Sequence, residues 1–261
     1  MNLKNIKTQN IILSLLVILP VLFSAKISLA ATTTTDKFCL TVPILMYHHV
    51  EPTAQAKANG QEKLYVDSDI FAKQMEYFKK NSYHSISTEE LIAALRTGKK
   101  LPKKTIVITL DDGYQDNYDY AFPVAKKYGL IINIMVPTGL LESSGYLSWG
   151  EVLEMAASNL VFFYNHTDSH FPLAQGKKSK VLYELNLAQD KLQKALGYNV
   201  PRIITYPYGD YNSSTIKIAQ ADSFIAGLTT KKGNYQCSAS IMELHRQRIG
   251  NTLKMREYYG L

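Results

Sequence analysis

The sequence predicts a single-domain α/β protein built on a mostly parallel sheet or barrel. From Val42 onward, short apolar runs rich in β-branched residues alternate with segments of helical period, which is typical of βα units. The chain has 261 residues, of which 46% are hydrophobic and 20% are charged. It is therefore long and apolar enough to bury a full core, and its composition excludes disordered, collagen-like and coiled-coil proteins.

The predicted strands are short apolar runs bounded by turn-forming or polar residues. A polar segment, Glu51–Lys63, is predicted to be a loop. The strands are expected at Pro43–Tyr47, Thr105–Leu110, Ile131–Val136, Leu160–Tyr164, Arg202–Tyr206 and Phe224–Leu228.

The predicted helices lie between these strands and carry recognisable end signals. Ser87 with Glu90 three residues later forms a capping-box pattern, and Asn212 is a plausible N-cap. Glycines occur where three helices should stop, at Gly98, Gly129 and Gly197. The helices are expected at Asp69–Lys80, Thr88–Arg96, Tyr118–Tyr128, Gly150–Ala157, Val181–Leu196 and Ser213–Gln220.

The N-terminus has the pattern of a secretory signal peptide. Lys4 and Lys7 precede an apolar run, Ile11–Ala25, and Ser28 and Ala30 are small residues at the −3 and −1 positions of a cleavage site. An uncleaved anchor is disfavoured because the run is shorter than the roughly 20 residues of a membrane-spanning helix and contains a proline. We therefore expect a signal peptide over residues 1–30, a linker over 31–41, a single folded domain over 42–261, and a secreted or cell-envelope protein without a membrane span after cleavage.

Charge and cysteine content narrow the partners and the kind of metal site. The chain carries 29 Lys+Arg against 22 Asp+Glu, but these charges are spread along the sequence, so we expect no nucleic-acid partner. The sequence indicates no particular protein partner. Cys39 and Cys237 are too few for a disulfide scaffold or a cysteine-built zinc module, and the sequence leaves open whether they pair. Any metal must be held mainly by His, Asp or Glu.

Two groups of potential ligands directly follow predicted strands. Asp111 and Asp112 come just after the strand Thr105–Leu110, although an Asp-Asp-Gly segment alone is more often a solvated turn. His166 and His170 follow the strand Leu160–Tyr164, and in a helical turn they would point the same way, as two ligands of one metal must. In isolation, such a histidine pair is more often a pair of surface or capping residues. Between them, Asp168 could orient an imidazole or cap the turn.

The position of these groups favours a catalytic site. In a parallel barrel, the loops after the strands assemble the active site at one mouth. His48 and His49 also follow a predicted strand, Pro43–Tyr47. Two imidazoles and one carboxylate are a usual catalytic zinc set that leaves a position for water, and a second carboxylate could then act as a base.

Several stretches also match a known family in order and separation. The first motif is Thr109-Leu110-Asp111-Asp112-Gly113-Tyr114, the second is His166-Thr167 through His170, and the third is Tyr206-Pro207-Tyr208-Gly209. The other matching stretches are Val136-Pro137-Thr138-Gly139, Tyr146-Leu147-Ser148-Trp149 and Leu228-Thr229-Thr230. On these residues the chain resembles the polysaccharide deacetylases with the NodB-homology domain, carbohydrate esterase family four, and the resemblance covers essentially all of Val42–Ile249. The resemblance implies a distorted (β/α) barrel that removes acetyl groups from N-acetylated sugars with a divalent metal, usually zinc.

The resemblance also implies roles for individual residues. Asp111 would be the general base, and Asp112, His166 and His170 would be the metal ligands. Tyr208 would offer its backbone N–H to the developing oxyanion.

One departure from the family pattern concerns the arginine that holds the base. Thr205 occupies its usual position two residues before the third-motif proline, so Arg248, or alternatively Arg246, is expected to replace it. The chain resembles instead a branch that includes the exported poly-N-acetylglucosamine deacetylases, in which an N-terminal Tyr-His supplies an active-site histidine. His48 is accordingly expected to protonate the departing amine, with His245 as the alternative.

The sequence thus predicts an exported, metal-dependent hydrolase that cleaves the N-acetyl amide bonds of a polysaccharide containing N-acetylglucosamine. A small-molecule amidohydrolase is the alternative enzyme. A non-catalytic carbohydrate-binding envelope protein with a vestigial site is the alternative outside enzymes, and Thr205 leaves room for it.

Overall fold

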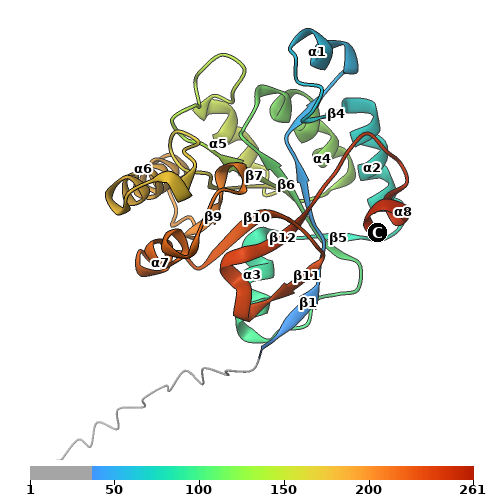
Figure 1. The fold of residues 1–261 in the computed structure, drawn as a ribbon. Coiled ribbons are helices and arrows are strands. Elements are labelled where there is room, and N and C mark those ends of the chain that lie inside the picture. Colours follow the sequence, from blue (N-terminus) through green and yellow to red (C-terminus); the bar gives the residue numbers. More distant parts are fainter. Residues whose placement is uncertain (1–36) are drawn as a thin grey trace, which may run out of the picture. The chain divides into compact units, whose positions relative to one another are not determined.

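The computed structural model describes residues 37–261, and their centre is a closed barrel of seven parallel strands (Figure 1). This arrangement confirms the predicted α/β barrel. Going round the barrel, the strands are β2 (Ile44–Tyr47), β12 (Leu244–Arg248), β10 (Ala226–Lys232), β9 (Ile203–Thr205), β8 (Val161–Asn165), β7 (Ile132–Val136) and β6 (Thr105–Asp111), which pairs again with β2.

The register brings the carboxyl ends of neighbouring strands to one mouth. Tyr47 of β2 pairs with Leu110 of β6, and Val136 of β7 pairs with Asn165 of β8. Every residue of β6 is buried because helices cover the outside of the barrel and side chains fill its inside. Residues that directly follow these strands therefore gather at the same end.

All six predicted helices are present, with small shifts at their ends. Asn212 caps its helix and Ser87 accepts from the backbone N–H of Glu90, as the end signals predict. Gly98, Gly129 and Gly197 are left-handed C-caps. The segment predicted as Tyr118–Tyr128 begins instead with a π-helical turn at Asn117–Ala121. The α-helices are α2 (Ser68–Lys80), α3 (Thr88–Thr97), α4 (Phe122–Tyr128), α5 (Trp149–Ala157), α6 (Lys178–Leu196) and α7 (Ser213–Ala221).

Several elements were not predicted from the sequence. Strand β12 completes the barrel although its sequence, LHRQR, contains no apolar run. The predicted loop Glu51–Lys63 contains a short helix and ends near a small parallel pair of strands. The additional elements are α1 (Thr53–Ala58), α8 (Met255–Tyr259), β3 (His49–Glu51), β4 (Tyr65–Asp67), β5 (His84–Ser85) and the 3-10 turns Leu173–Gln175, Pro207–Gly209 and Ser238–Glu243.

A disulfide joins two antiparallel strands outside the barrel. Cys39 of β1 (Cys39–Thr41) lies opposite Cys237 of β11 (Tyr235–Cys237), and the two cysteines are bonded. Strand β1 falls in the segment predicted as a linker, so the ordered fold begins before Val42. The predicted signal peptide over residues 1–30 lies outside the described residues. Within residues 37–261, no helix has both the length and the apolar composition of a membrane span.

Candidate active site

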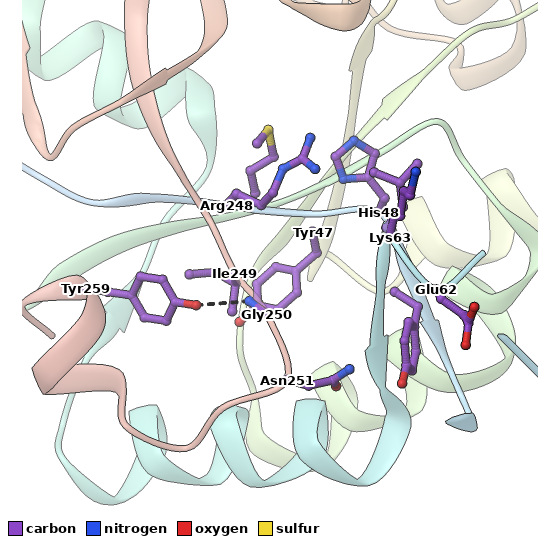
Figure 2. Close-up of a pocket in the computed structure, with 12 residues that line it drawn as sticks. Tyr47, His48, Glu62, Lys63, Arg248, Ile249, Gly250, Asn251 and Tyr259 are labelled. Carbon is purple, nitrogen blue, oxygen red and sulfur yellow. Dashed lines mark hydrogen bonds between the residues drawn. The ribbon is translucent and has the colours of Figure 1, made fainter. Parts of the chain in front are cut away.

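His48 directly follows β2 and stands between the barrel mouth and a cavity. Its Nε2 lies 4.0 Å from Oδ2 of Asp111, and its side chain is 13% exposed. On its other side is a cavity of about 360 Å³. Figure 2 shows this cavity, with the guanidinium of Arg248 directed toward the His48 ring. Burial lowers the pKa of His48 below 6.5. The negative charges of Asp111 and Asp112 raise this pKa in part, and the positive charges of Arg246 and Arg248 lower it. His48 is therefore neutral at pH 7 in the resting protein.

The segment that carries His48 is fixed by residues that follow the first motif. Asn117 donates from Nδ2 to the backbone oxygen of His48 at 2.9 Å. The next residue, His49, points elsewhere, as the alternation of side chains predicts, and its Nδ1 lies 2.6 Å from Oδ2 of Asp116. The His49 ring also stacks on Tyr114, with ring centroids 3.5 Å apart. These contacts tie the strand after His48 to the loop that follows Asp111 and Asp112.

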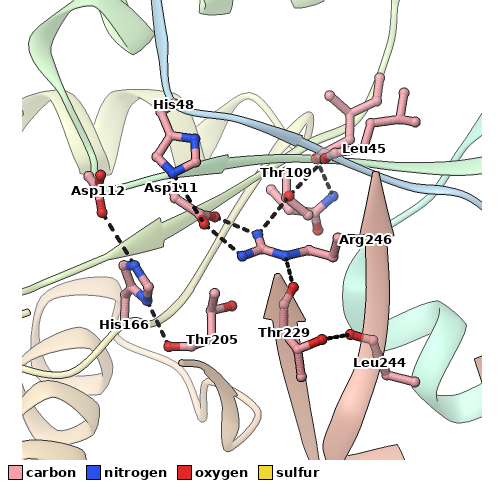
Figure 3. Close-up of polar contacts among 12 residues, drawn as sticks. Leu45, His48, Thr109, Asp111, Asp112, His166, Thr205, Thr229, Leu244 and Arg246 are labelled. Atoms are coloured by element: carbon pink, nitrogen blue, oxygen red, sulfur yellow. Dashed lines mark hydrogen bonds and ion pairs between the residues drawn. The ribbon is translucent and has the colours of Figure 1, made fainter. Parts of the chain in front are cut away.

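Asp111 is paired with Arg246, not with Arg248 (Figure 3). Two guanidinium nitrogens of Arg246 donate to the two carboxylate oxygens of Asp111, both at 2.7 Å. The remaining donors of this buried arginine bond the backbone oxygen of Thr229 at 2.7 Å and Oγ1 of Thr109 at 3.2 Å. Arg248 is exposed and makes no contact with Asp111. The expectation that placed Arg248 beside the base is thus corrected to Arg246.

This pairing keeps Asp111 ionised inside the barrel. Burial alone would raise the pKa of Asp111, but the charge and the hydrogen bonds of Arg246 outweigh burial and hold it below 3.8. His245, the neighbour of Arg246 on β12, faces the other way and lies against Gly233. Of the two histidines considered for proton delivery, only His48 is at the mouth.

The three predicted metal ligands converge beside Asp111. Oδ1 of Asp112 lies 3.3 Å from Nε2 of His166 and 3.2 Å from Nε2 of His170. The sequence predicted a helical turn that carries both histidines, but the structure has no such turn there. Thr167 and His170 both have positive φ angles, 66° and 58°, and the loop curls so that the two rings face the same carboxylate.

The donor set fits a divalent cation. The His166 ring is fixed by Nδ1, which lies 2.7 Å from the backbone oxygen of Thr205, and this contact directs Nε2 toward Asp112. Oδ1 of Asp112 is buried without a hydrogen-bond partner among the described residues. Burial raises the pKa of Asp112, but the two imidazoles outweigh burial and hold it well below 3.8, so Asp112 is a carboxylate. Two imidazole nitrogens that face a carboxylate oxygen without a hydrogen-bond partner are a set that Zn²⁺ accepts.

The histidine loop is held in place by a helix residue that sequence analysis missed. Glu184 of α6 accepts from the backbone N–H groups of Asp168 and Ser169, at 3.0 and 2.8 Å, and from the Ser169 hydroxyl at 2.8 Å. The signal was present in the sequence, since Glu184 lies on the mostly apolar buried stripe of α6 beside Val181 and Leu185. An acid on such a face needs buried partners.

Asp168 plays neither of the roles considered for it. Its Oδ1 accepts from the Thr138 hydroxyl at 2.8 Å and from Nζ of Lys191 at 2.6 Å, so it orients no imidazole and caps no turn. Tyr208 has a φ of 60°, and its ring centroid lies 4.4 Å from that of His170. The third motif is therefore at the same mouth as the candidate metal ligands.

Comparisons with known proteins agree with this arrangement. Residues 98–224 match the family model described as polysaccharide deacetylase. The putative polysaccharide deacetylase YxkH of Bacillus subtilis is 30% identical over 80% of this chain and 71% of its own length. The poly-beta-1,6-N-acetyl-D-glucosamine N-deacetylase of Staphylococcus epidermidis is 30% identical over 71% of this chain and 68% of its own length. The enzyme of that name from Escherichia coli K12 is 24% identical, and the match spans only 37% of its length.

A solved structure shows the same fold. The Streptococcus pyogenes deacetylase PplD, in complex with acetate, aligns with a TM-score of 0.74 and 32% identity over 80% of this chain and 92% of its own.

Proposed function

Because the chain belongs to the polysaccharide deacetylase family, we propose that it is an exported, metal-dependent hydrolase that removes N-acetyl groups from a polymer of N-acetylglucosamine. One observation carries the proposal. Asp112, His166 and His170 converge beside Asp111, a second carboxylate that Arg246 keeps ionised. Two carboxylates in different surroundings can divide the work of holding a cation and of moving a proton.

The cation would be held by Asp112, His166 and His170. This set of two imidazoles and one carboxylate favours Zn²⁺. Such an ion, when bound, polarises the acetamide carbonyl and lowers the pKa of a neighbouring water. The backbone N–H of Tyr208 would donate to the oxyanion that forms from the carbonyl oxygen. These assignments match the roles that the family resemblance implies.

Asp111 would take a proton from the attacking water. The water oxygen bonds to the acetyl carbon, and the proton passes to His48, whose Nε2 is 4.0 Å from the Asp111 carboxylate. Because His48 is neutral at rest, it can accept that proton and then deliver it to the amine nitrogen as the carbon–nitrogen bond breaks. The products are acetate and a free amino sugar.

The polymer substrate and the location outside the cytoplasm rest on separate observations. Two relatives are named for a β-1,6-linked N-acetylglucosamine polymer, which supports this class of substrate. Export is supported by the basic and apolar leader with small residues at Ser28 and Ala30. The vestigial-site alternative loses its basis because Arg246 supplies the arginine that is missing at Thr205.

Acetate release from defined glycans tests the proposal. The chain lacking residues 1–30 is stripped with a chelator and assayed, with and without added Zn²⁺, on β-1,6- and β-1,4-linked N-acetylglucosamine hexamers and on the monomer. We expect release from a hexamer only after Zn²⁺ is restored, and little from the monomer. A His166→Ala/His170→Ala variant is the control and should stay inactive with Zn²⁺. Release that is unaffected by chelation, or faster from the monomer than from either hexamer, would contradict the proposal.

A further inference from the structure

The cavity beside His48 has two cationic side chains that the proposed chemistry does not use. Arg248, from the end of β12, and Lys63, from the segment before β4, both line it. Neither forms an ion pair or a side-chain hydrogen bond with any residue in the described part of the chain. At the adjoining mouth, by contrast, Arg246 and Asp111 are paired with each other.

The two cations lie near the reacting groups and not at a random place on the surface. His48 forms a wall of the cavity and also lies 4.0 Å from Asp111, so the cavity adjoins the barrel mouth. Arg248 is close enough to lower the pKa of His48. In Figure 2 its guanidinium points into the space beside the His48 ring. A glycan with its acetamide at Asp111 would therefore extend toward Arg248.

The cavity also contains one acid, Glu62. In Figure 2 the Glu62 carboxylate points away from Arg248, and it forms no ion pair with either cation. The polar lining that remains includes Tyr65 and Asn251. A volume of about 360 Å³ is at the lower end of the range for ligand pockets, which suits a single sugar unit.

We propose that this cavity binds an oxyanion, a carboxylate or a phosphate, carried by the sugar next to the one that is deacetylated. Arg248 would bind the oxyanion through its planar pair of donors and Lys63 as a point charge. The inference rests on the proposed function and adds a substrate class to it: an acetylated glycan with acidic substituents is preferred over a neutral one.

The test compares three hexasaccharides with the same N-acetylglucosamine backbone, one neutral, one with lactyl carboxylates and one with phosphates. The readout is the ratio of kcat/KM for each acidic glycan to that for the neutral glycan. Because effects on His48 act on all three substrates alike, they cancel in this ratio. The variants are Arg248→Gln and Lys63→Gln, with Lys217→Gln on α7 as a control that removes the same charge from an exposed, unpaired lysine outside the cavity.

In the wild type the ratio should exceed one for a glycan with the correct oxyanion, and it should fall as salt is added. Arg248→Gln and Lys63→Gln should each lower it by roughly threefold to tenfold, since each removes one partly exposed charge-assisted contact. Lys217→Gln should leave it unchanged. The two acidic arms show whether the carboxylate or the phosphate is bound.

A wild-type ratio of one for both acidic glycans would overturn the proposal, as would equal ratios in Arg248→Gln and Lys217→Gln. Equilibrium binding of the same glycans to the chelated wild type separates this result from a failure of the proposed function. Preferential binding of an acidic glycan without any acetate release would support the cavity and contradict the deacetylase.

Discussion

Replacing Arg246 by glutamine removes the only cation that is bonded to the buried Asp111 within the described residues. The wild-type pair has two bonds of 2.7 Å, and the Arg246 side chain has no exposed surface. Loss of one partner from a buried ion pair costs about 3–5 kcal/mol because the other charge stays desolvated. For a domain of this size, that corresponds to a decrease in Tm of roughly 6–20 °C.

Thermal unfolding followed by circular dichroism measures this loss, with Arg248→Gln as the matched control. The exposed Arg248 has no such partner, so its replacement should change stability by less than about 0.5 kcal/mol. Arg246→Lys keeps the charge but loses the paired geometry and should fall between the two.

The effect of Arg246→Gln should also depend on pH. Because Arg246 holds the pKa of Asp111 below 3.8, its stabilisation is complete above that value and is lost as pH falls through the lowered pKa. The difference between wild type and variant should therefore narrow in acid. An Arg246→Gln protein as stable as Arg248→Gln at pH 7 would refute the reasoning.

Three further changes test other parts of the structure. Glu184→Ala should weaken metal binding about tenfold to a hundredfold because it frees the histidine loop, and Glu184→Gln should restore part of the affinity. Equal metal affinity in the wild type and both variants would exclude a positioning role. Reduction of the Cys39–Cys237 disulfide, which closes a loop of 198 residues, should cost about 2–5 kcal/mol of stability and leave turnover at 25 °C intact, as a melting curve and an acetate assay can check. His48→Ala should lower kcat and remove the acidic limb of the pH–rate profile, because the wild type needs a neutral His48, whose pKa lies below 6.5. An acidic limb that is unchanged in the variant would show that another group causes it.

The barrel strands that could be predicted from the sequence are those with a continuous apolar run. Strand β6 is buried along its whole length, and its composition shows it. Strand β12 was missed because its sequence is polar. Leu244, Arg246 and Gln247 are buried because β10 and β2 flank the strand, and the charge of Arg246 is paired with Asp111. Such a strand forms because of its tertiary contacts, and these contacts cannot be predicted from local composition.

The same missing strand explains the error about the arginine. Arg246 and Arg248 are two residues apart, so alternation places them on the same face of β12. Only the pairing of β12 with β2, in which Arg248 lies opposite Met46, shows which of the two reaches Asp111. Without β12 in the prediction, that register could not be known.

At the candidate site, the identity of the grouped residues was predictable but their backbone geometry was not. The positions after each strand brought Asp112, His166 and His170 together, as barrel topology requires. The spacing of the histidines suggested a helical turn, whereas the loop uses positive φ angles at Thr167 and His170. Non-glycine residues in that region are uncommon and leave no reliable trace in the sequence.

The division of labour between Asp111 and Asp112 is the central claim, and one paired measurement tests it. Bound zinc per chain, determined by elemental analysis, is compared with kcat for acetate release in Asp111→Asn and Asp112→Asn. Asp111→Asn should keep zinc and lose roughly a hundredfold or more in kcat, because a general base is removed. Asp112→Asn should lose zinc and activity together, because a ligand is removed. Equal zinc loss in the two variants, or zinc loss in Asp111→Asn alone, would contradict the account.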